Sequence, residues 1–63
     1  MTADEFKAWR KRVNKTQQEA ADELGSTKRS VQGWEDGSQP IKRSIALACA
    51  AIEAGLKPIG EAE

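Results

Sequence analysis

Apolar residues recur at helical spacing in several stretches of the chain, and short polar segments separate these stretches. Near the N-terminus Phe6, Trp9 and Val13 follow one another at intervals of four or three residues, which places them on one face of a helix. A stripe with similar spacing near the C-terminus consists of Ile41, Ile45, Ala48 and Ile52. The pattern predicts an all-α domain whose last helix spans about residues 41–54, with Pro40 suited to its first position.

Residues 16–36 predict two short helices joined by a tight turn. Thr16 and Glu19 have the spacing of a capping box, in which side-chain oxygens bind the free N–H groups of a helix's first turn. Gly25 suits the left-handed position that ends a helix, and the cap of the next helix falls at Ser26 or, preferably, at Thr27. Thr2 and Glu5 repeat the capping box before the first helix. The segment therefore predicts a helix-turn-helix.

The second helix of this pair divides into two faces. One face is basic or hydrogen-bonding and consists of Lys28, Arg29, Gln32 and Gly33. The other face consists of Ser30, Val31 and Trp34, which suit a core. Such a helix can be anchored by one side and offered to a DNA major groove by the other. Gly33 either permits close approach of DNA or is uncontacted, and the sequence leaves both open.

The last predicted helix is apolar nearly all round. Its second stripe, which looks away from the core stripe, consists of Leu47, Ala50, Ala51 and Ala54. A helix with this pattern on the outside of a small domain lies under something or meets another subunit. We therefore expect the stripe to form a homodimer interface. Residues 58–63 follow as a short tail, which either packs through Ile59 or stays mobile.

Composition limits the function classes. The 63 residues predict one domain, 1–63, and ten basic residues balance ten acidic ones. Residues 1–34 hold seven Lys/Arg against five Asp/Glu, so we expect the binding surface in that half. Without histidine and with one cysteine, the chain lacks the usual catalytic and metal-ligating sets, so we expect no enzyme, metal, cofactor or small-molecule substrate. With no secretion signal and no apolar run of membrane-spanning length, we expect a cytoplasmic location, at the nucleoid when bound to DNA.

The motif resembles the helix-turn-helix core of the Cro/repressor (XRE-like) family of phage and bacterial regulators. The resemblance spans about residues 6–56 and is carried by Thr16-Gln17-Gln18-Glu19-Ala20-Ala21, Leu24-Gly25, Ser30-Val31, Trp34-Glu35 and Gly37. It implies a compact, lambda-repressor-like bundle of four or five helices that binds operator DNA as a dimer. A chain this small also resembles regulators of phages and mobile elements, including those that accompany anti-CRISPR genes.

The resemblance also implies roles for single residues. The residues expected to contact bases are Gln17, Lys28, Arg29, Gln32 and Gly33, the last where the family often has a longer side chain. An ion pair between Arg10 and Glu35 is implied, with solvent or a phosphate as the alternative for Arg10. Lys15 stands where the family usually has leucine. Phosphate contacts are expected from Lys11, Arg12, Lys15 and Thr27.

These observations support one principal hypothesis. Two subunits would associate through the last helix and place their recognition helices in successive major grooves of an inverted-repeat operator. Repression of a promoter, its own among the candidates, would follow from steric occlusion. A protein-interaction module, such as an antitoxin or adaptor subunit, is the alternative. An RNA-binding role ranks third because exposed aromatic stacking residues are absent from the sequence pattern.

Overall fold

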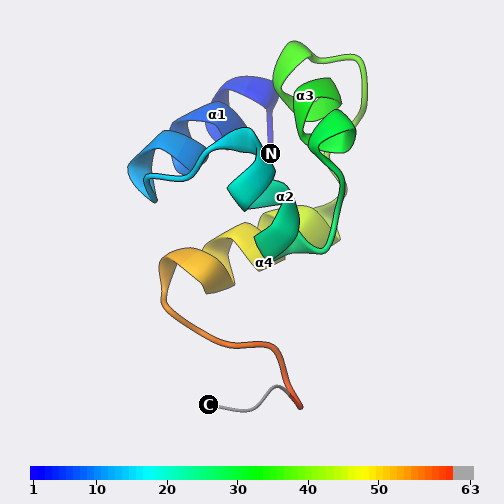
Figure 1. The fold of residues 1–63 in the computed structure, drawn as a ribbon. Coiled ribbons are helices and arrows are strands. Elements are labelled where there is room, and N and C mark those ends of the chain that lie inside the picture. The colour runs from blue at the N-terminus through cyan, green and yellow to red at the C-terminus, as the bar shows by residue number, and fades with distance from the viewer. Residues whose placement is uncertain (61–63) are drawn as a thin grey trace.

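The computed structural model describes residues 1–60 and contains four α-helices within that range. They are α1 (Ala3–Arg12), α2 (Gln17–Leu24), α3 (Lys28–Asp36) and α4 (Arg43–Glu53). Figure 1 shows α1, α2 and α3 grouped together, with α4 running beneath them and the C-terminal segment extending away from the end of α4. The predicted all-α class and the predicted helix-turn-helix are confirmed.

Capping boxes form at both predicted positions. The Oγ1 atom of Thr2 accepts a 3.1 Å hydrogen bond from the N–H of Glu5, and the Glu5 carboxylate accepts one of 2.7 Å from the N–H of Thr2. Thr16 and Glu19 form the same reciprocal pair at 3.1 and 2.9 Å. These bonds satisfy backbone donors that the first turn of a helix leaves without partners, so they fix where α1 and α2 begin.

The core collects residues from all four helices. Its buried members are Phe6, Trp9, Ala20, Ala21, Val31, Trp34 and Cys49. The ring centroid of Phe6 lies 5.3 Å from that of Trp9 and 5.4 Å from that of Trp34, so Phe6 packs directly against both tryptophan rings. Partly buried side chains complete the cluster: Val13, Leu24, Ile41, Ile45 and Ile52. The predicted core faces of the first and third helices are therefore confirmed. In α4, Ile45 and Ile52 of the predicted stripe pack against the core, but the fully buried residue is Cys49, which lies outside that stripe.

The start of α4 differs from the prediction. Pro40 and Ile41 lie in the loop before α4, which has Lys42 as its N-cap and begins at Arg43. Gly37 ends α3 in the left-handed conformation, and the backbone N–H of Gln39 donates a 3.1 Å hydrogen bond to the carbonyl oxygen of Gly33. This bond holds the loop against α3, so α4 begins later in the sequence than predicted. Ile41 still packs against the core, from the loop.

The chain turns away after α4. Gly55 is left-handed at φ 79°, and the N–H of Leu56 donates a 2.9 Å hydrogen bond back to the carbonyl oxygen of Ala51. Leu56 is 65% exposed and Ile59 is fully exposed, so Ile59 does not pack as one sequence interpretation proposed. The rest of the predicted tail, residues 61–63, lies outside the described residues.

Candidate nucleic-acid interface

The helix-turn-helix is built by close packing of α2 against α3. Ala20 and Ala21 of α2 and Val31 of α3 are fully buried, and small side chains allow the two helices to approach closely. Gly25 ends α2 at φ 68°, and the N–H of Ser26 donates a 2.8 Å hydrogen bond to the carbonyl oxygen of Ala21. The turn is thus a left-handed cap of the kind that the sequence predicted, and it fixes the direction in which α3 leaves.

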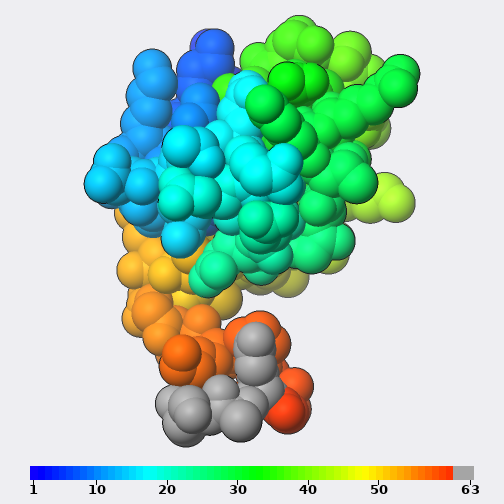
Figure 2. All heavy atoms as spheres, in the orientation of Figure 1, coloured from blue at the N-terminus to red at the C-terminus, as the bar shows by residue number. Residues whose placement is uncertain are grey.

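Helix α3 presents one polar face to solvent. Thr27 caps the helix, and its Oγ1 accepts a 3.2 Å hydrogen bond from the N–H of Ser30. Val31 and Trp34 hold the opposite face in the core. The exposed side chains of α3 include Lys28, Arg29 and Gln32. In Figure 2 the green side chains of α3 project from one edge of the molecule. The structure therefore brings together three of the five predicted base-contacting residues on one accessible surface.

An ion pair ties the end of α3 to α1. Arg10 Nε lies 2.5 Å from Glu35 Oε2, Arg10 Nη2 lies 3.2 Å from Glu35 Oε1, and the two side chains are only 16% and 5% exposed. Arg10 Nη1 also donates a 2.9 Å hydrogen bond to the carbonyl oxygen of Lys15. The structure thus contains the pair that the family resemblance implied. It also gives the lysine at position 15 a structural task that depends on its backbone, not on its side chain.

Gln17 extends this network into α2. Its Nε2 atom donates a 3.2 Å hydrogen bond to Glu35 Oε1, so one carboxylate connects α1, α2 and α3. Gln17 is half-buried, unlike the exposed residues Lys28, Arg29 and Gln32 of α3. Contact of Gln17 with a base stays a prediction, and in this structure the side chain helps to orient Glu35.

The network also shifts the titration of Glu35. Burial by itself raises the pKa of the carboxyl, whereas the hydrogen bonds from Arg10 and Gln17 and the charges of Arg10 and Lys7 lower it. The lowering effects win, and the pKa lies below its ordinary value. Glu35 therefore carries its negative charge at neutral pH, which makes it a permanent partner for the guanidinium group.

Gly33 is buried, although its neighbours on the same helical face are exposed. The side chain of Gln39 covers it: a Cβ atom at position 33 would lie 2.9 Å from Cγ, Cδ and Nε2 of Gln39. The glycine is therefore explained by packing inside the chain. Direct contact of Gly33 with DNA stays a prediction and would require the Gln39 side chain to move aside.

The predicted phosphate-binding residues lie in different surroundings. Lys11 is exposed on α1, whereas Lys15 is half-buried. Arg12 forms an ion pair with Glu53 of α4, in which Arg12 Nη2 donates a 3.0 Å hydrogen bond to Glu53 Oε1. The hydroxyl of Thr27 donates to Ser30 Oγ at 3.1 Å. Of the four, Lys11 is the side chain most simply available to a phosphate, and Arg12 and Thr27 would exchange an internal partner for one.

Sequence reasoning missed three polar residues that follow α3. Gln39 lies against α3, and Lys42 and Arg43 are exposed where α4 begins. Neither cation suits a helix N-terminus, where the backbone dipole favours negative charge. The signal was present in the adjacent pair Lys42-Arg43, but the charge count by halves of the chain concealed it because the C-terminal half is acidic overall.

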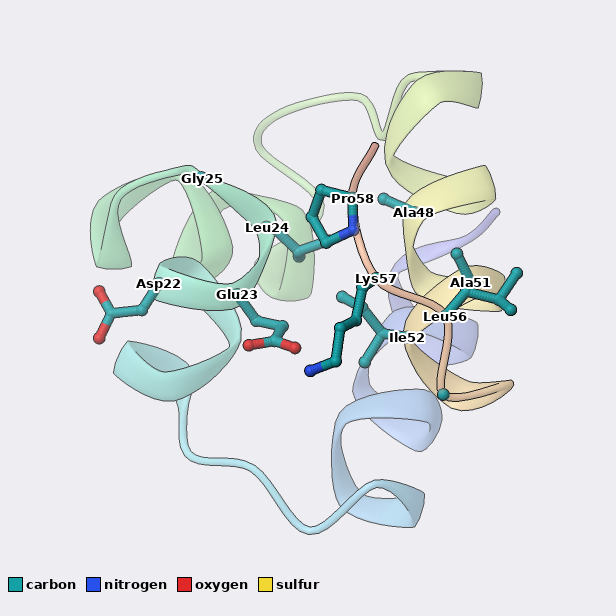
Figure 3. A pocket seen from close by; sticks show the side chains of 11 residues that line it. Asp22, Glu23, Leu24, Gly25, Ala48, Ala51, Ile52, Leu56, Lys57 and Pro58 are labelled. Carbon is teal, nitrogen blue, oxygen red and sulfur yellow. The ribbon is translucent and has the colours of Figure 1, made fainter. Parts of the chain in front are cut away.

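A hollow lies between the end of α2, α4 and the segment that follows it. Figure 3 shows Leu24, Ile52 and Leu56 around it, with the carboxylates of Asp22 and Glu23 on the α2 side. No residue of α3 lines this hollow. Within residues 1–60 there is no cluster of three or more His, Cys, Asp or Glu side chains that could hold a metal ion. No helix in the same range is long and apolar enough to cross a membrane.

The fold and the exposed face of α3 define a helix-turn-helix protein. In it α3, the second helix of the motif, has one face accessible to a ligand. A family model described as helix-turn-helix matches residues 6–56, which is most of the chain. The chain belongs to this helix-turn-helix family, that of the XRE/Cro-like regulators, and it is a DNA-binding transcription regulator. No curated protein and no solved structure matches the chain.

Proposed function

We propose that the protein is a repressor that binds an inverted-repeat operator as a homodimer. The observation that carries this proposal is the exposure of Lys28, Arg29 and Gln32 on α3, whose opposite face is fixed in the core. Arginine and lysine suit O6 and N7 of guanine, and glutamine suits N6 and N7 of adenine. Such a face can read bases while the rest of the domain stays rigid.

The exposed surface of α4 supports association of two copies. Leu47 is 58% exposed, and Ala50 of α4 and Ala54, the C-cap residue of this helix, are exposed as well. Ala51, the fourth residue of the predicted stripe, is half-buried and lines the hollow. Apolar side chains gathered on the outside of a small domain are typical of an interface. Association here would place two α3 helices about 34 Å apart, in successive major grooves.

Cations outside α3 would add affinity without reading sequence. Lys11 on α1 and Lys42 and Arg43 at the start of α4 are exposed, and phosphate contacts of this kind weaken as salt is added. A dimer held in this way covers more than one turn of DNA. We infer repression because a bound dimer would block access of polymerase to an overlapping promoter.

Selection of bound sites from a random DNA pool tests the proposal. The wild type, Arg29→Ala and the control Lys57→Ala are compared at the same moderate salt concentration; Lys57 is an exposed cation beyond α4. We expect an inverted repeat from the wild type and the control. Arg29→Ala should lose about 1–3 kcal/mol of DNA-binding free energy, and the preference at one base pair should disappear. Absence of any enriched motif would overturn the proposal in favour of a protein-interaction module.

Sedimentation of Leu47→Glu tests the dimer separately. A charged side chain at this exposed apolar position should shift the protein to monomer and reduce operator affinity, while the melting temperature stays near that of the wild type. Leu56→Glu, another exposed leucine of the C-terminal half, is the matched control. A wild type that is monomeric both free and on DNA would contradict this part of the proposal.

A further inference from the structure

The polar face of α3 that carries Lys28, Arg29 and Gln32 is partly covered by a side chain from outside the helix. Cγ, Cδ and Nε2 of Gln39 all lie 2.9 Å from the place of a Cβ atom at Gly33, and the Gln39 N–H is bonded to the Gly33 carbonyl oxygen at 3.1 Å. The glutamine side chain therefore lies over the helix at the one position of that face that has no side chain. Backbone and side chain of Gln39 together fasten the loop to α3.

The position of this side chain follows from helical geometry. Residues four apart in a helix lie one above the other on the same face, and Gly33 is four residues after Arg29. A group that covers position 33 is thus about one helical turn, roughly 5.4 Å, beyond Arg29 along the polar face. Gln39 is itself an exposed residue, and its side chain lies over position 33 of α3.

The amide is also chemically available. Among residues 1–60 the hydrogen bond formed by Gln39 comes from its backbone N–H, while its side-chain amide has no protein partner. By contrast, the amide of Gln17 is bonded to Glu35 and that of Gln18 to Asp22. A side-chain amide presents one acceptor and two donors, the combination that pairs with N6 and N7 of adenine in the major groove.

We propose that Gln39 acts as a specificity-determining residue that reads an adenine in the operator, in place of the side chain that Gly33 lacks. This inference rests on the proposed operator-binding function. Gly33 leaves room for the Gln39 side chain, and the hydrogen bond between their backbones fixes the position of the Gln39 amide along α3. One helical turn of about 5.4 Å corresponds to less than about two base pairs, because each base pair rises by about 3.4 Å. The adenine that Gln39 reads therefore lies within about two base pairs of the guanine contacted by Arg29.

The first test compares wild type, Gln39→Met and Gln39→Ala in selection from a random DNA pool, followed by affinity measurements on the selected operator. Methionine keeps an aliphatic chain over Gly33 but removes the amide, so we expect an unchanged melting temperature. Affinity for the selected operator should fall about tenfold, and preference at one adenine should disappear. Gln18→Met, which removes an exposed amide from α2, is the matched control and should behave as the wild type.

The second test fills the space over position 33 and keeps the Gln39 amide in the chain. In Gly33→Ala the new Cβ atom would meet Gln39 atoms at 2.9 Å and displace the side chain, although Gln39 is still present. We expect loss of the same adenine preference, with stability at least equal to the wild type because alanine favours helix more than glycine. Retention of the adenine preference in Gly33→Ala would overturn the inference.

The outcomes also separate this inference from the function on which it rests. An enriched motif that depends on Arg29 but is unchanged by Gln39→Met overturns the role of Gln39 alone. Equal weakening on all DNA sequences would make Gln39 a phosphate contact and would also overturn base reading. If the wild type enriches no motif, the operator-binding function fails and this inference fails with it.

Discussion

The indole Nε1 of Trp9 donates a 2.9 Å hydrogen bond to the carbonyl oxygen of Cys49, although 40 residues separate the two positions. Both residues are about 1% exposed. The bond satisfies the polar atom of a buried tryptophan and joins α4 to α1. A small core gains from such a contact because a buried donor without a partner is costly.

Replacement of Trp9 by phenylalanine should therefore destabilise the fold by about 2 kcal/mol or more, since a cavity forms and the Cys49 carbonyl loses its donor. Urea denaturation followed by circular dichroism measures this loss. Trp34→Phe removes the same group from the other tryptophan of the core and is the matched comparison. Equal losses in the two variants would show that the hydrogen bond contributes nothing beyond volume.

The losses of unfolding free energy on removing Arg10 and Glu35 one at a time should add up to more than the loss on removing both together. Arg10→Met or Glu35→Leu leaves a charged group largely buried without its counterion, at a cost of roughly 3 kcal/mol. The double variant leaves neither charge, so its loss should be smaller than the sum by at least about 1 kcal/mol. A double-mutant cycle by chemical denaturation measures this coupling, and additive losses would contradict it.

The same pair should make the free energy of unfolding decrease as the pH falls. The pKa of Glu35 is lowered in the folded chain, because the effects of Arg10 and Gln17 exceed that of burial. Its contribution is therefore present above the ordinary value of 4.5 and is lost as pH falls through the lowered pKa. The difference in unfolding free energy between wild type and Glu35→Gln should be constant near neutrality and shrink below about pH 4.5.

Thermal or urea unfolding of both proteins between pH 7 and about pH 3 gives this difference directly. The comparison cancels the titration of the other carboxylates, whose pKa values are also lowered at Glu5, Glu19, Asp36 and Glu53. A difference that grows as the solution becomes more acidic would have the wrong sign for a carboxylate stabilised in its charged form.

The Arg12–Glu53 pair predicts unequal contributions of neighbouring cations to DNA binding. Lys11 is exposed, while Arg12 is bonded to Glu53. Lys11→Ala should reduce the slope of log affinity against log salt by about 0.9, and Arg12→Ala should reduce it less. Glu53→Gln should strengthen binding by freeing Arg12. Fluorescence anisotropy with a labelled operator at several salt concentrations tests this, and weaker binding of Glu53→Gln would contradict it.

The elements that the sequence predicted correctly depend on local chemistry. Thr16 with Glu19, Gly25 at the turn and the spacing of Val31 and Trp34 each act within one or two helical turns, so a single stretch of sequence shows them. The fold class and the exposed face of α3 followed from such signals, and the Arg10–Glu35 pair followed from the family resemblance.

The features that the sequence did not predict depend on contacts between distant segments. Arg12 and Glu53 are 41 residues apart, and no local pattern pairs them. Pro40 looked like the start of a helix because proline fits that position, yet the bond between Gln39 and Gly33 holds the loop back on α3. The burial of Gly33 likewise depends on a residue that lies outside its helix.

The division of α3 into an anchored face and a free face has a consequence for divergence. Lys28, Arg29 and Gln32 are exposed, and stability resides in Val31, Trp34 and the Glu35 network. Under the proposed function, a substitution at any of these three exposed positions would change the bases that α3 contacts at little cost to folding. New DNA targets would then be accessible by single mutations, and a designer could exchange the same three side chains on an unchanged scaffold.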